Sequence, residues 1–154
     1  MIEPFAANLA AHRATKAERQ HLRVLLGRME SSIDNPSVFA AADLELHTAI
    51  LAASHNLILL HLTNTIAEAL AASRTVTTQS QAASEASQPL HGVVVAEIVA
   101  GRGEQASQAM RLLIGEAFVD IKSLLEDSAA AEDSTSPVLP DAATRSVRRE
   151  EPPT

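Results

Sequence analysis

The chain has 154 residues, enough for one domain with a hydrophobic core and too few for two independent ones. Its 19 acidic residues against 12 basic residues give a net charge of −7, which disfavours direct binding to the phosphate backbone of nucleic acids. Aromatic residues make up only 2% of the chain and Cys is absent, which excludes a base-stacking platform, disulfides, thiolate metal sites and a cysteine nucleophile.

Helix-forming residues dominate and β-branched alternation is nearly absent, so we expect an all-α fold. The first three helices are predicted over about 3–13, 16–32 and 36–53. Apolar residues at three- and four-residue steps from Leu22 to Ile33 define the second helix. Asp34 or Asn35 can cap the third helix, which has Pro36 in its first turn.

The second half of the chain is also predicted to be helical. A fourth helix begins after Asn56, which suits an N-cap, and weakens in the β-branched and polar stretch 75–80. A fifth helix is predicted over about 88–100 with Pro89 in its first turn, and a sixth runs to about 126. Short connections between about six helices predict an antiparallel bundle whose sites lie between facing helices.

The two ends of the chain delimit the folded part. Beyond Glu126 the composition shifts to Ala, Ser, Asp, Thr and Pro, which bury too little apolar area to offset the entropy of ordering. We therefore expect a helical domain over 1–127 and a disordered tail over 128–154.

The N-terminus has no basic segment followed by an apolar one, and no stretch approaches the roughly 20 apolar residues of a membrane span, so we expect a soluble, cytoplasmic protein.

Three polar side chains occupy positions on predicted apolar helix faces. On the third helix, Asp43 lies in the same row as Phe39 and Leu46. His47 follows Asp43 by one turn, and on the fifth helix His91 stands at the N-terminal end of an apolar stripe. A carboxylate on such a face is costly unless a cation, a donor network or water compensates it.

One Asp and two His form a donor set that suits a borderline divalent cation. Three protein ligands leave positions open for water or for the carboxylate of a small organic acid. Taken alone, the spacing favours a satisfied core pair of Asp43 and His47 with an unrelated His91. The same set also occurs in non-haem iron oxygenases, but the sequence supplies no acid–base group beside it, so we expect no enzymatic activity.

Several motifs follow one another along the chain in a characteristic order. They are Glu3-Pro4-Phe5-Ala6-Ala7-Asn8-Leu9-Ala10-Ala11, Asp43-Leu44-Glu45-Leu46-His47, Ala53-Ser54-His55-Asn56, the segment from His91 to Gly101, and Ala106 with Ala109-Met110. This ordered set resembles the FCD domain, the C-terminal effector domain of the FadR subgroup of GntR-type bacterial transcription regulators. The resemblance covers roughly residues 1–125.

The resemblance implies a helical bundle that usually dimerises and binds a small metabolite, commonly an organic acid, often through a metal held by one Asp and three His. Asp43, His47 and His91 match three of these ligands. The fourth family His falls on Leu113, so one ligand is missing; Glu116, one turn later, is more simply expected to be exposed.

Three alternatives follow from the missing ligand. A metal of the Zn, Ni or Mn class is held by Asp43, His47 and His91 and completed by water or effector oxygens, or the pocket binds its ligand without a metal, or the domain is degenerate and only dimerises. Arg74, at the end of the fourth helix, can pair with an effector carboxylate, although the helix dipole explains its position equally well.

The resemblance also implies how such a domain acts. A winged helix-turn-helix precedes it in the family and is missing from this chain, so DNA would be contacted through that other domain. We expect an allosteric sensor in which a small carboxylate metabolite repositions helices at a homodimer interface.

Overall fold

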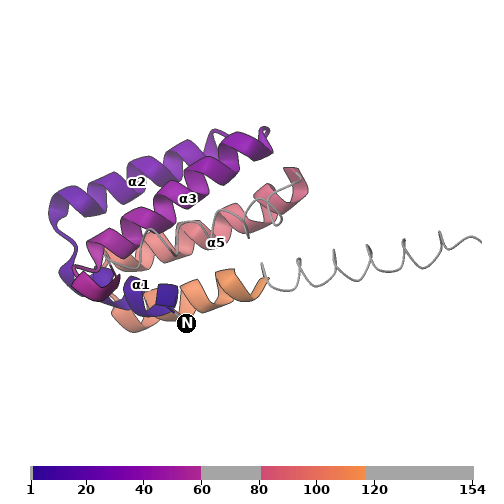
Figure 1. The fold of residues 1–154 in the computed structure, drawn as a ribbon. Helices are drawn as coiled ribbons and strands as arrows, with labels where there is room; N and C mark the ends of the chain where they lie inside the picture. Colours follow the sequence, from indigo (N-terminus) through magenta and orange to yellow (C-terminus); the bar gives the residue numbers. More distant parts are fainter. Residues whose placement is uncertain (1, 60–80, 117–154) are drawn as a thin grey trace, which may run out of the picture.

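The computed structural model describes residues 2–59 and 81–116, and the regular structure in these ranges is entirely helical (Figure 1). Its helices are α1 (Ile2–Arg13), α2 (Lys16–Glu30), α3 (Pro36–Ala53), a helical start at 57–59, α5 (Gln81–Val99) and a last helix at 103–116. The predicted all-α class is therefore confirmed.

The tail expected over 128–154 and the end of the fourth helix lie outside the described residues. None of the described helices combines the length and apolarity needed to cross a membrane.

The helices pack around one main hydrophobic core. In Figure 1, α3 lies beside α2, and α5 runs along the same pair, while the shorter α1 lies near one end. The largest fully buried apolar side chains of this core come from α2, α3, α5 and the last helix: Leu22, Leu25, Met29, Phe39, Leu46, Ile50, Val94, Ile98 and Met110. The core therefore joins segments from both halves of the sequence.

Helix α1 approaches its neighbours through small side chains. Ala6, Ala7, Ala10 and Ala11 are all 0% exposed, so little more than backbone separates α1 from the elements beside it. The last helix also begins close to α1, because a Cβ atom on Gly103 would lie 2.3 Å from the imidazole of His12. Such a close approach requires small residues at the contact.

Capping residues define the helix starts as the sequence predicts. The Asn35 side chain accepts a hydrogen bond from the Val38 N–H at 3.3 Å, and Pro36 stands in the first turn of α3. Asn56 likewise accepts from the Ile58 N–H at 3.0 Å. Because these side chains satisfy N–H groups that lack partners within the helix, the two predicted starts are confirmed.

The N-terminus of α2 has a reciprocal capping box that also contacts the turn after α3. Thr15 accepts from the Glu18 N–H at 3.2 Å, and the Glu18 carboxylate accepts from the Thr15 N–H at 2.7 Å. The Thr15 N–H is the largest cause that lowers the pKa of Glu18, so this carboxylate stays ionised at neutral pH. Glu18 also contacts His55, just beyond α3, at 3.0 Å.

Helix α5 begins earlier than the sequence suggests. It starts at Gln81 and not near residue 88, so Pro89 lies inside the helix and the predicted start was wrong. Proline removes the hydrogen bond to the carbonyl four residues earlier, here that of Glu85. Both residues are exposed, so the interruption faces outward, and the Ala-rich segment before Pro89 favours a helix that continues through it.

One arginine joins the ends of two helices. The guanidinium of Arg19 donates to the Ala11 and Ala14 carbonyls, at 2.9 and 3.1 Å, and to the Val99 carbonyl at 2.7 Å. These carbonyls belong to the C-terminal ends of α1 and α5, where helices carry acceptors without intrahelical partners and partial negative charge. Arg19 therefore fixes α1 and α5 at the same end of the bundle.

Helix α5 ends in a left-handed glycine. Gly101 has φ +74°, its N–H donates to the Ile98 carbonyl at 3.1 Å, and the Arg102 N–H donates to the Glu97 carbonyl at 3.0 Å. These two bonds form a Schellman motif, which satisfies the last carbonyls of the helix and needs a residue that tolerates positive φ. The glycine thus sets the direction in which the chain leaves α5.

We predict that Gly101→Ala lowers the free energy of unfolding by about 1–2 kcal/mol, because an L-residue is strained at positive φ. A Cβ atom there would meet only ordinary contacts, 3.6 Å from the Ala11 carbonyl, so the loss is due to the backbone. Urea denaturation measures the change. Gly27→Ala is the matched control: it lies inside α2 with nothing within 4 Å of a Cβ atom, and we expect it to be neutral or stabilising. Equal losses in the two variants would contradict the assignment.

Candidate metal centre

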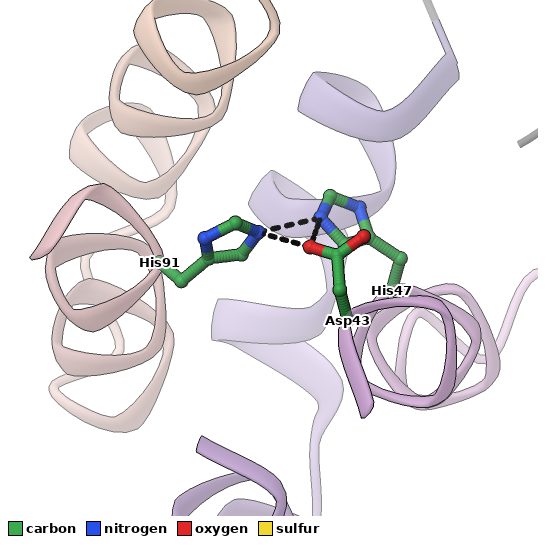
Figure 2. Close-up of side chains that lie close together, drawn as sticks. All are labelled: Asp43, His47 and His91. Carbon is green, nitrogen blue, oxygen red and sulfur yellow. Dashed lines mark hydrogen bonds and ion pairs between the residues drawn. The ribbon is translucent and has the colours of Figure 1, made fainter. Parts of the chain in front are cut away.

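Three buried polar side chains meet between α3 and α5. Asp43 and His47 lie one turn apart on α3, and His91 projects toward them from α5 (Figure 2). Their exposed fractions are 1%, 1% and 3%. The structure therefore brings together the three residues that the sequence analysis singled out, in a place from which bulk water is excluded.

One carboxylate oxygen and two ring nitrogens converge at this point. Asp43 Oδ1 lies 2.6 Å from His91 Nε2 and 3.7 Å from His47 Nε2, and the two Nε2 atoms are 3.2 Å apart. The two rings are nearly perpendicular, with an interplanar angle of 83°. Each residue thus presents one ligand-type atom to the same small space.

These separations are close to those of ligands around one metal ion. Metal–ligand bonds of about 2.0–2.2 Å place neighbouring ligand atoms about 2.8–3.6 Å apart in tetrahedral or octahedral geometry. The 3.2 Å separation lies within this range, the 3.7 Å separation lies just above it, and the 2.6 Å contact between Asp43 and His91 lies below it and must lengthen. A small side-chain movement would be enough.

The other nitrogen of each ring faces an acceptor. His91 Nδ1 donates to the backbone carbonyl of Ser87, one turn earlier on α5, at 2.9 Å. His47 Nδ1 donates to the carboxylate of Glu3, on α1, at 2.5 Å. A proton on Nδ1 leaves the lone pair of a neutral imidazole on Nε2. In the neutral form of each ring, the Nε2 lone pair would therefore face Asp43.

Three ligand-type atoms in one buried space favour a positive species between them. A proton shared between an imidazole and Asp43 is one solution, but a proton bridges only two of the three atoms. A divalent cation interacts with all three at once, and two imidazoles with a carboxylate suit ions of the zinc and nickel type. The donor set therefore fits a metal ion, with positions left for further ligands.

The family of the chain follows from a comparison with known domains. The model of the FCD domain matches residues 1–116, which include all four helices named above, the last helix and the three convergent residues. The chain belongs to the FCD domain family. An FCD domain is the C-terminal effector-binding domain of GntR-type regulators, so the resemblance seen in the sequence is confirmed. No curated protein matches the chain.

One position departs from the ligand pattern expected of an FCD domain. Leu113, where the fourth His of the family falls, is 4% exposed and belongs to the same core as Leu46 and Val94. It supplies apolar contact and no ligand atom. Glu116 is exposed, as expected, and Arg74 lies outside the described residues. The candidate ligand set among the described residues is therefore Asp43, His47 and His91.

The sequence analysis assigned no role to two residues that contact the histidines. Glu3 belongs to the opening motif of the FCD resemblance, which was the only available signal, but it is 44 residues from His47 and no spacing links them. Ser87 precedes His91 by four residues and acts through its backbone carbonyl, which any residue type provides. The contacts of Glu3 and Ser87 with the histidines can therefore be seen only in the three-dimensional structure.

Proposed function

We propose that this FCD domain senses a small carboxylate metabolite through a divalent metal ion held by Asp43, His47 and His91. The observation that carries the proposal is the convergence of Asp43 Oδ1 with the Nε2 atoms of His47 and His91 in one buried space. A metal of the Zn, Ni or Mn class would be bound there. When bound, it supplies a positive charge and open coordination positions that attract a carboxylate.

The missing fourth ligand supports a role for the effector in completing the site. With Leu113 in place of a histidine, three protein atoms hold the ion, and oxygens from water or the metabolite fill the remaining positions. An effector carboxylate would then contribute to metal affinity as well as being bound by the metal.

The placement of the ligands on two helices supports a sensing role. Asp43 and His47 belong to α3 and His91 belongs to α5, so a ligand that joins them favours one relative position of these helices. Such a preference can couple the site to a distant surface. FCD domains belong to transcription regulators, so we propose a cytoplasmic, non-catalytic sensor whose output passes to DNA through the winged-helix domain of such a regulator.

Exposed apolar side chains support the proposed homodimer. Leu57 and Ile58 are each 72% exposed, and on α1 Ile2 and Phe5, three residues apart on one face, are 41% and 52% exposed. Large exposed apolar side chains of this kind are typical of association sites. A second copy of the chain is the partner we propose.

We predict that the full chain binds Zn²⁺ or Ni²⁺, and that His47→Ala and His91→Ala weaken binding by more than the roughly 10–100-fold that loss of an outer-shell contact causes. Each substitution removes a ligand atom from the site. Isothermal titration and elemental analysis of protein purified without chelator measure the effect. His21→Ala is the control, because His21 is exposed on α2. Equal metal content in the wild type and all three variants would refute the site.

Leu113→His gives the complementary test of the same site. It restores the family's fourth ligand, so it should tighten metal binding relative to the wild type if the proposed ligand set is correct. Circular dichroism checks that the variant stays folded with an imidazole in the core. Unchanged affinity in a folded variant would count against the ligand positions transferred from the family.

We also predict that small mono- and dicarboxylates bind only in the presence of the metal. The test compares protein loaded with Zn²⁺ and protein treated with chelator. At least one carboxylate should raise the melting temperature of the Zn²⁺-loaded protein, and none should raise that of the chelator-treated protein. Thermal denaturation with a panel of carboxylates measures this. Equal stabilisation with and without metal would favour the alternative of a metal-free pocket.

For association, sedimentation equilibrium should give about twice the chain mass of 16.3 kDa, because dimerisation removes exposed apolar area from water. Dilution should shift the mass toward that of one chain. A mass of 16.3 kDa at every concentration would contradict the homodimer.

A further inference from the structure

Glu3 contacts the site from a third helix. It lies in the first turn of α1, and its Oε1 is 2.5 Å from Nδ1 of His47, on the opposite side of the ring from Asp43 and His91. The Glu3 side chain is 12% exposed and that of His47 is 1% exposed. The contact is therefore largely shielded from water, where a hydrogen bond to a charged group is strong.

We infer that Glu3 is a positioning residue of this centre: its carboxylate holds the proton of His47 on Nδ1 and so turns the Nε2 lone pair toward the metal position. The inference rests on the proposed function, because that lone pair matters only if a cation is bound. A carboxylate behind a ligating imidazole fixes its tautomer and orientation and increases its strength as a ligand. Glu3 is the group that can do this for His47.

The two histidines differ in what orients them. His91 donates from Nδ1 to the Ser87 carbonyl within its own helix, so the acceptor behind its ring belongs to α5. His47 depends on a charged group from α1. The ligand atoms come from α3 and α5, and the correct orientation of one of them also requires the first turn of α1 to be docked.

This dependence couples metal binding to α1. A metal on Nε2 withdraws electron density from the imidazole, which makes Nδ1–H a stronger donor to Glu3. The other end of α1 is held separately, because Arg19 binds the Ala11 carbonyl and Arg13 donates to the Ser54 carbonyl at 3.1 Å. Since coupling is reciprocal, an ion at the centre strengthens docking of the first turn, and a docked first turn strengthens ion binding.

The test uses Glu3→Gln and Glu3→Ala in the full chain, with Zn²⁺ alone as the probe. Isothermal titration should show affinity weakened about 10–100-fold by Glu3→Ala, and less by Glu3→Gln, whose amide oxygen still accepts a hydrogen bond without charge. Glu30→Gln is the control for charge, because Glu30 is exposed at the end of α2. Wild-type affinity in folded Glu3→Ala would overturn the inference while leaving the proposed metal site intact.

Two further measurements separate positioning from a general structural role. Long-range ¹H–¹⁵N spectra of the imidazoles should show the Nδ1–H tautomer of His47 in the wild type and its loss in Glu3→Ala. Hydrogen exchange should show that Zn²⁺ protects the first amides of α1 in the wild type but not in Glu3→Ala. If the wild type binds no Zn²⁺, the proposed function fails, and the spectra still decide the role of Glu3: a His47 tautomer unchanged by Glu3→Ala would overturn it.

Discussion

The structure depends on the burial of one carboxylate against two imidazoles. Asp43 is 1% exposed in the middle of α3, where an isolated charge would be very costly. His47 follows on the same face, and His91 meets both from α5. The acceptors behind the two rings, Glu3 and the Ser87 carbonyl, orient them toward Asp43. Polar groups on three helices are therefore arranged around a single point.

The apolar core around Asp43, His47 and His91 restricts the movement of these side chains. Phe39 and Leu46 flank Asp43 along α3, and Val94 and Val95 follow His91 along α5; all four are at most 2% exposed. Close-packed side chains of this kind resist movement, so Asp43, His47 and His91 are held in place without a bound ligand. Arg19 adds a polar contact between α1 and α5 at the end of the bundle.

Local signals in the sequence predict the positions of the helices better than they predict the contacts between helices. The start of α3 is predicted correctly because Asn35 and Pro36 form a strong helix start. Pro89 gives a similar signal for α5, but the helix-forming residues before it extend the helix to Gln81. Periodicity placed Asp43, His47 and His91 on apolar faces, but only the family pattern linked residues on different helices. Glu3 escaped assignment because a contact between α1 and α3 leaves no trace in residue spacing.

Under the proposed function, the replacement of the family's fourth histidine by Leu113 changes how metal and effector depend on each other. A site with four protein ligands holds its ion largely independently of the effector. A site with Asp43, His47 and His91 alone leaves more of the coordination to small molecules, so effector oxygens contribute a larger share of the binding free energy of the ion. By reciprocity, the ion then contributes as much to the affinity for the effector. Under the proposed function, this domain responds to the metal and the carboxylate jointly, and the loss of one ligand makes that joint dependence stronger.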